Sequence, residues 1–343
     1  MFHKLLPTDS NRLTISVHHP NISLLNGEDE IPKGIDIALL TCNPENGYAI
    51  RQQFYTLAFD HFEDIRICDL GDAMALDKVE ISKLVSHLLD KKIFLLMVGF
   101  SRDIIEAISK EFEQKILPFS IAWIDSRIHE DEIENLSNNI FVKNQSYIGL
   151  QRHLISSTIL NDPRVLGHTI FLSEFRKSNQ VLDAVTRNSE LFYFEMNSVR
   201  HSDFNPSDNP SGFFAEEIIS ISKLAGSSDR SLLCAISDWD ISDIQPTDYM
   251  LISQMCWYMV EGILLKKRDE LQRDRQMLHY VVELKNSDTH LDFFKSESSG
   301  KWWIKEPGDH ESHINKLIPC TYEEYLKTVQ DHLPERLVDL IYH

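Results

Sequence analysis

The sequence predicts an α/β protein with three layers, in which helices cover both faces of a mainly parallel β-sheet. Short, almost continuously apolar runs such as IDIALLTC (35–42) and KIFLLMVGF (92–100) are typical of strands buried on both faces. Segments with helical spacing of apolar residues, such as LDKVEISKLVSHLLDKK (76–92), lie between such runs. Repeated alternation of this kind indicates a parallel sheet enclosed by helices.

The alternation continues through most of the chain. Strands or apolar runs are expected at 35–42, 65–72, 92–100, 119–125, near 146–150, at 168–173, 190–196 and 232–240. Helices are expected at 47–59, 76–92, 102–115, 150–160, 177–188, 212–225 and 249–270. In folds of this kind ligands bind at the carboxyl ends of the strands, so residues that directly follow a strand are the first candidates for a site.

Three regions are expected along the chain. Residues 1–33 are a mixed, surface-type lead-in, 34–270 form the α/β domain, and 271–343 form a small C-terminal appendage made of a β-hairpin and a helix. The appendage contains the strand-like runs LDFFKS and KWWIKEP with a turn at SESSG. Its helix is expected to begin with a capping box between Thr321 and Glu324.

Composition excludes several classes of partner. The 343 residues carry a formal charge of −19, which disfavours binding to nucleic acid or to an anionic membrane. The longest apolar run is too short to span a bilayer, and the N-terminal segment MFHKLLPTDS lacks the apolar core of a signal peptide. Five dispersed cysteines without a C-x-x-C pair indicate reduced thiols, so we expect a cytoplasmic protein.

Polar residues follow two of the expected strands. Asp125, Arg127 and His129 stand at alternate positions after the apolar run FSIAWID, and Glu195 and Asn197 follow LFYF. Judged on the residues alone, the first group is a strand end with a solvated loop. Glu195 alone favours a salt bridge over catalysis. The motifs G-x-G-x-x-G, P-loop and G-x-S-x-G are absent from the sequence, so nucleotide binding and triad hydrolysis have no support.

Taken in order, these strand ends resemble the arginase family of ureohydrolases, which includes arginase, agmatinase and formimidoylglutamase. LLMVGFSRDI stands where the family has G-G-D-H-S, and WIDSRIHE stands where it has D-A-H-x-D. FYFEMNSVRH corresponds to F-D-x-D-x-x-D-P, and SDWDISDIQP corresponds to D-x-V-E-x-N-P. The resemblance extends over about residues 34–268 and implies an arginase-like fold.

The family hydrolyses C–N bonds with two manganese ions that share a bridging hydroxide. By this resemblance, the chain keeps only part of the family's set of metal ligands. Several of the corresponding positions have changed in residue type. The positions are Ser101, Asp125, Arg127, His129, Glu195 and Asn197. The acidic residue that orients substrate in the family corresponds to Asp243, which is the candidate catalytic residue.

Arg127 is the most consequential of these changes. An arginine is always protonated and does not ligate a cation, but it forms ion pairs with carboxylates. We therefore expect the Arg127 guanidinium to occupy the place of the second metal and to neutralise Asp125 and Glu195. Around the other metal position, Asp125, His129 and Glu195 remain as three ligands for a single ion.

Two classes of function stay open. The first is an arginase-fold protein without a dimanganese centre and without a cofactor, which acts in binding, regulation or assembly. The second is a formimidoylglutamase- or agmatinase-like hydrolase of linear amidine C–N bonds, with Mn²⁺ in a modified or single-metal site. A third alternative is a protein that binds an unrelated ligand in the cleft that holds the substrate in the family. The partner would be a small guanidino or amidino ligand or another protein, and the family's trimers and hexamers point to a homo-oligomer.

Overall fold

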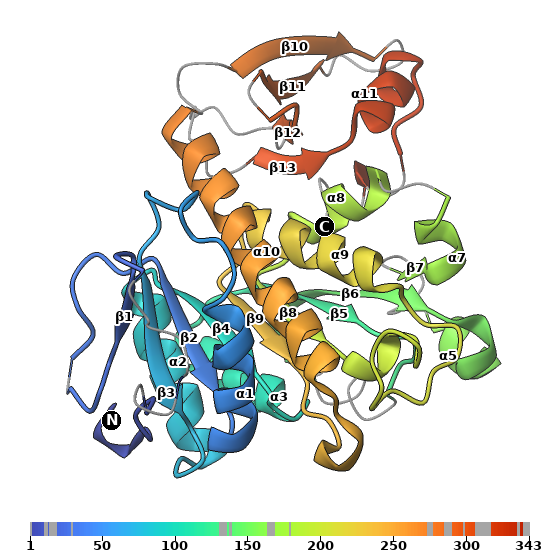
Figure 1. Ribbon diagram of the computed structural model, residues 1–343. Coiled ribbons are helices and arrows are strands. Elements are labelled where there is room, and N and C mark those ends of the chain that lie inside the picture. The colour runs from blue at the N-terminus through green and yellow to red at the C-terminus, as the bar shows by residue number, and fades with distance from the viewer. Residues whose placement is uncertain are drawn as a thin grey trace.

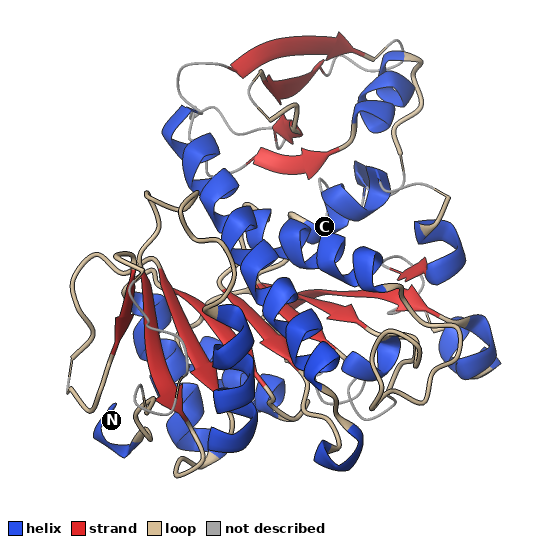
Figure 2. Ribbon diagram, viewed as in Figure 1, coloured by secondary structure: helices blue, strands red, loops and turns tan. Residues whose placement is uncertain are grey.

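The computed structural model contains two β-sheets and the helices that cover them (Figures 1 and 2). It describes residues 2–9, 13, 19–28, 30–129, 136, 139–162, 169–177, 180–272, 277–284, 290–297, 299–305, 317–334 and 337–338. Within this described part, no helix is long and apolar enough to cross a membrane.

The larger sheet has nine strands, and every pair of neighbours in it is parallel. The strands are β1 (Ile22–Leu24), β2 (Ile37–Thr41), β3 (Ile67–Asp72), β4 (Phe94–Val98), β5 (Phe119–Ile124), β6 (Val142–Leu150), β7 (Thr169–Phe171), β8 (Leu191–Phe194) and β9 (Leu233–Ile236). Their spatial order is β1-β3-β2-β4-β9-β8-β5-β6-β7. The parallel sheet expected from the apolar runs is therefore confirmed.

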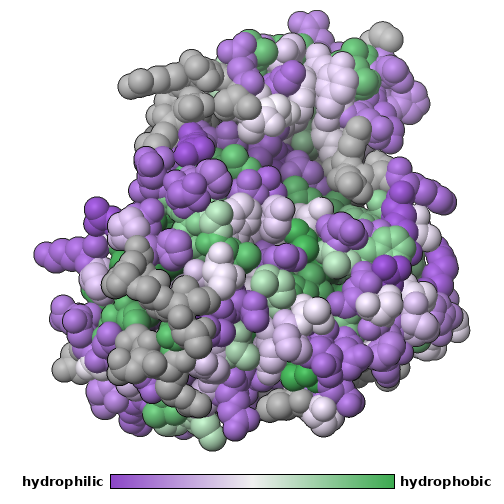
Figure 3. Space-filling view, in the orientation of Figure 1, coloured by the Kyte–Doolittle hydropathy of each residue, from purple (hydrophilic) through white to green (hydrophobic). Residues whose placement is uncertain are grey.

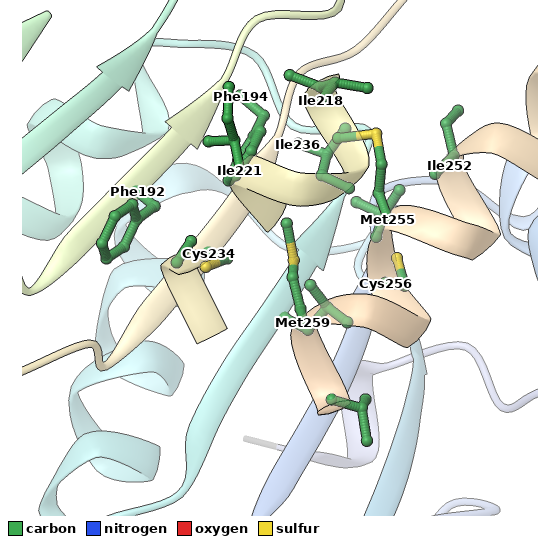
Figure 4. Packing of buried hydrophobic residues seen from close by; sticks show 14 of the residues in the cluster. Phe192, Phe194, Ile218, Ile221, Cys234, Ile236, Ile252, Met255, Cys256 and Met259 are labelled. Carbon is green, nitrogen blue, oxygen red and sulfur yellow. The ribbon is translucent and has the colours of Figure 1, made fainter. Parts of the chain in front are cut away.

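Helices lie on both faces of this sheet (Figure 1). The main ones are α1 (Pro44–Phe54), α2 (Lys78–Asp90), α3 (Ile104–Gln114), α8 (Gln180–Thr186), α9 (Ala215–Ser227) and α10 (Pro246–Gln272). One apolar core joins the sheet to α1, α9 and α10, and a second core on the opposite face joins it to α2 and α3. Figure 4 shows the first core where α9 and α10 meet β8 and β9.

Helices α9 and α10 pack at very short range because each has a glycine at the contact. A Cβ atom on Gly226 would lie 2.2 Å from the carbonyl oxygen of Met259. A Cβ atom on Gly262 would lie 2.2 Å from the carbonyl oxygen of Lys223. The two helices therefore form one tightly joined layer over the centre of the sheet.

Two segments differ from the expected elements. The helix expected at 150–160 is divided into a 3₁₀ turn, η2 (Arg152–Leu154), and a short helix, α5 (Ser157–Leu160). The division arises because Ile155 is extended, with φ −127° and ψ 132°, and because the side chain of Ser156 caps a new helix. The segment before residue 34, expected as a surface lead-in, includes η1 (Phe2–Lys4) and the edge strand β1, which pairs with β3.

The C-terminal appendage is more than the expected hairpin and helix. Its four antiparallel strands, in the order β10-β11-β12-β13, are β10 (Met277–Glu283), β11 (His290–Ser296), β12 (Trp302–Lys305) and β13 (Leu317–Cys320). Helix α11 (Tyr322–Val329) follows, and the expected capping box between Thr321 and Glu324 is present. A separate apolar core, with Phe293 and Ile304 at its centre, holds this sheet and its helix together.

The appendage contacts the α/β domain near the amino ends of β8 and β9. Trp303 donates from Nε1 to Asp229 at 2.7 Å, and Lys301 donates to the carbonyl oxygen of Ser227 at 3.1 Å. The buried guanidinium of Arg187 stacks on the Trp303 ring, 4.9 Å from its centre. The aromatic appendage therefore lies at the opposite edge of the sheet from the carboxyl ends of the strands (Figure 1).

Candidate functional site

The structure brings most of the candidate residues to one edge of the sheet. Asp125 follows β5, Glu195 follows β8, and Ser101 follows β4 after a two-residue link. In β5 and β8 the residue pairs Trp123–Tyr193 and Ile124–Phe194 are in register. Since Asp125 and Glu195 are the next residues of these two paired strands, their carboxylates are placed side by side.

An arginine connects these two carboxylates, and it is Arg102. Its Nη1 lies 2.5 Å from Oδ2 of Asp125 and 3.7 Å from Oε2 of Glu195. The side chain of Asp125 is almost completely buried, and that of Arg102 is 15% exposed. A permanent positive charge therefore lies between the two acids, where a metal ion would otherwise be needed to compensate them.

Two aromatic rings hold the Arg102 guanidinium in place. Its central carbon lies 4.5 Å from the centre of the Trp123 ring and 5.5 Å from that of Tyr193. Both rings are buried, and both stand two residues before the carboxylates, so they project from the same face of the sheet. The Tyr193 hydroxyl donates to the carbonyl oxygen of Phe100 at 3.1 Å, which fixes the loop that carries Arg102.

The hypothesis that Arg127 supplies this charge is wrong. The side chain of Arg127 is exposed, and its contact with Asp125 is made by its backbone N–H, 3.1 Å from Oδ1. The chain bends at Ser126 and Arg127, so the side chain no longer follows the alternation of the strand. The predicted feature, an arginine that neutralises Asp125 and Glu195, is present, but a different residue provides it.

Glu195 has an unusual protonation equilibrium. Burial raises its pKa to about 7, and the charge of Asp125 acts in the same direction, whereas Arg102 acts against both. Oε1 of Glu195 accepts from the backbone N–H of Asn197 and from the hydroxyl of Ser237, each at 3.2 Å. This carboxyl therefore binds a proton more tightly than an ordinary glutamate, and the two hydrogen bonds fix its orientation.

The other candidate positions lie at the border of this group. Ser101 donates from its hydroxyl to Asp103 at 2.6 Å, so it is engaged away from the carboxylates. His129 is half exposed, with Nε2 at 3.7 Å from Oδ2 of Asp125. Asn197 is exposed, and its backbone rather than its amide contacts Glu195. Asp243 is exposed in η4 (Ile241–Asp243), and its carbonyl oxygen accepts from Asn205 at 2.5 Å.

The residues at this edge differ in chemistry from the donor set of a dimanganese centre, because an arginine lies against both carboxylates. Within the described part of the chain, which includes every expected ligand position, no three His, Cys, Asp or Glu side chains are grouped so that they could hold a metal ion. The Arg102 guanidinium lies 2.5 Å from the Asp125 carboxylate and 3.7 Å from that of Glu195. A second cation beside these carboxylates would be repelled by it.

Four residues of the site were missed by reasoning from the sequence: Arg102, Trp123, Tyr193 and Ser237. A signal existed for the two aromatic residues, because each precedes a candidate acid by two positions in an apolar strand and so shares its face. Arg102 directly follows Ser101, in the segment after β4 that differs from the family's G-G-D-H-S. Ser237 directly follows β9, the strand between β4 and β8.

The chain shares the fold of solved structures of the arginase superfamily, and an arginine-bridged pair of carboxylates lies at the carboxyl ends of its strands. A formiminoglutamase from Trypanosoma cruzi superimposes with a TM-score of 0.60 at 16% identity, covering 70% of this chain and 96% of that one. The formimidoylglutamase from Bacillus subtilis gives 0.57 at 13% identity, with 68% and 89% covered.

A hypothetical agmatinase from Burkholderia thailandensis gives a TM-score of 0.55 at 13% identity, covering 69% of this chain and 88% of that one. No protein-family model and no curated protein matches the sequence. The arginase-like fold expected from the strand ends is thus confirmed by structure, at an identity that establishes the fold alone.

Proposed function

We propose that this chain is a non-catalytic arginase-fold protein that acts in binding, regulation or assembly. The observation that carries the proposal is the ion pair between Arg102 and Asp125, with Nη1 2.5 Å from Oδ2. Some of the similar structures are formiminoglutamases with two Mn²⁺ ions. In this chain the protein itself supplies the cation at the strand ends.

The charge balance supports this proposal. Two neighbouring buried carboxylates repel each other, and removing the partner of a buried charge costs about 3–5 kcal/mol. Arg102 satisfies Asp125 directly and Glu195 at longer range, and the raised pKa of Glu195 lets the second acid take up a proton. This compensation of charge within the protein supports a site that does not need a bound metal ion.

All five cysteines of the chain are free, and four of them are buried. Reduced buried thiols are typical of proteins from reducing compartments, so we place the action of this protein in the cytoplasm. The ligand that fits the proposal is a small guanidino or amidino compound or another protein, bound without hydrolysis. An assembly of several copies is part of the same proposal.

The test is a Mn²⁺ titration of the full chain, read by bound metal and by melting temperature. Binding to the native state raises stability by RT ln(1 + [L]/Kd), so even weak binding is detected. We expect bound metal near zero, an unchanged melting temperature and no hydrolysis of guanidino or formimino compounds. Arg102→Met should gain a Mn²⁺-dependent rise in melting temperature, and Arg127→Met, the matched control, should not.

One observation favours the second function class. His129 has Nε2 3.7 Å from Oδ2 of Asp125, so its imidazole lies beside one of the two acids. A single-metal hydrolase would then use Asp125, His129 and Glu195. About one Mn²⁺ per wild-type chain, lost in His129→Gln together with hydrolysis of an amidine, would establish this class and overturn the non-catalytic proposal.

A further inference from the structure

The outer surface of α9 and α10 carries a groove that is separate from the strand-end site. Its volume is about 1100 Å³, and it extends along both helices to the turn at 299–301 of the appendage. The apolar residues that line it are Ile219, Leu224, Tyr258 and Leu265, of which Leu265 is 40% exposed. Figure 3 shows apolar side chains gathered on this face of the molecule, below the appendage.

Charge on this surface is balanced, unlike that of the chain as a whole. The chain has 53 acidic and 34 basic residues, so two copies repel each other over most of their surface. The charged residues that line the groove are three acids and three bases: Asp183, Glu216, Asp269, Lys223, Arg268 and Lys301. A locally neutral, partly apolar surface is where a second copy of such an acidic chain can approach.

The acidic and basic residues along α9 are also arranged so that two antiparallel copies of the helix would pair opposite charges. Glu216, Ile219, Ser220 and Lys223 line the groove at helical spacing, so they share one face of α9. Glu216 and Lys223 are equally far from the midpoint between Ile219 and Ser220. If two α9 helices cross antiparallel at that midpoint, Glu216 of each copy faces Lys223 of the other, as a two-fold axis requires.

We propose that this groove is the two-fold interface of a homodimer, with the α9 helices of two copies packed antiparallel about Ile219 and Ser220. One Glu216–Lys223 pair then forms at each end of the contact, and the apolar residues that line the groove are covered. Stable dimers bury about 800 Å² per copy. Phe214, which is 37% exposed at the start of α9, extends the contact beyond the groove. This inference is independent of the strand-end site.

Sedimentation velocity of the full chain over a range of concentrations tests the interface. We expect a dimer for the wild type and weaker dimerisation for E216K and for K223E, because each variant places like charges opposite each other. An equimolar mixture of the two variants should restore the dimer, because a mixed pair has opposite charges at both ends. Circular dichroism and melting temperature establish that both variants are folded.

Lys110→Glu on α3 is the matched control. Lys110 has an ion pair with Glu106 at 3.2 Å on the opposite helix layer, just as Lys223 has one with Glu261 at 3.0 Å. This control loses a similar surface ion pair and should dimerise like the wild type. A wild type that stays monomeric at every concentration would overturn the proposal. So would a dimer that neither variant weakens, or one that the mixture fails to restore.

Discussion

Arg102 and Asp125 form a buried ion pair, with Nη1 of the guanidinium 2.5 Å from Oδ2 of the carboxylate. The two residues follow β4 and β5, which are separated in the sheet by β9 and β8. The contact therefore ties together two loops that the sheet alone does not connect. It also sets the charge of the whole edge, because Glu195 from the intervening strand β8 lies 3.7 Å from the same nitrogen.

Replacement of Arg102 should be strongly destabilising. In Arg102→Ala, Asp125 keeps its buried position but loses its cation, and Trp123 and Tyr193 lose the group that packs on them. We expect the free energy of unfolding to fall by about 3–5 kcal/mol, which is usual when one partner of a buried ion pair is removed. Urea unfolding followed by circular dichroism measures this change.

Arg127→Ala serves as the matched control for that measurement. The side chain of Arg127 is exposed, so its loss should change the free energy of unfolding by no more than about 0.5 kcal/mol. Its backbone contact with Asp125 stays in place. Equal costs for the two variants, or a larger one for Arg127→Ala, would mean that Arg102 is not the residue that neutralises the carboxylates.

Arg187 should hold the appendage to the α/β domain. It is fully buried, donates from Nη2 to the carbonyl oxygens of Trp302 and Cys320, and stacks on Trp303. In Arg187→Ala two buried carbonyl groups lose this donor, so we expect a cost of about 3 kcal/mol. Hydrogen exchange should rise in β12 and β13 and stay unchanged at the strand-end site, since the two regions lie at opposite edges of the sheet.

Arg230→Ala is the comparison for the appendage. Arg230 is partly exposed and has an ion pair with Glu190 at 3.7 Å, near the amino end of β8. Its loss should leave hydrogen exchange in β12 and β13 as in the wild type. If exchange in these strands rises equally in both variants, the docking of the appendage does not depend on Arg187.

The fold was predictable because its physical signals are local and repeated. Strands such as β2 and β4 are buried at every position, and a continuous apolar run is the direct consequence in the sequence. The division of the segment at 150–160 was not predictable in the same way. It depends on the extended backbone of Ile155 and the cap of Ser156, inside a segment whose apolar spacing still resembles one helix.

The site was predictable as far as the register of the strands determines it. Asp125 and Glu195 were expected together, and the in-register pairing of β5 with β8 brings them together. The source of the positive charge was not predictable from spacing. After a strand ends, the direction of a side chain is set by the turn, and the bend at Ser126 and Arg127 turns Arg127 outward while Arg102 reaches in from the loop after β4.

Glu195 should make stability depend on pH. Burial and Asp125 raise its pKa from 4.5 to about 7 in the folded chain, whereas the unfolded chain keeps the ordinary value. The folded state therefore binds this proton more tightly, so the contribution to stability is fully present below about pH 4.5 and is lost as the pH rises through about 7. A rise of this size corresponds to on the order of 3 kcal/mol. Glu195→Gln does not titrate, so the wild type should lose free energy of unfolding relative to this variant across that window. Urea unfolding of both proteins at a series of pH values measures the difference, and parallel curves would show that folding does not raise the pKa of Glu195.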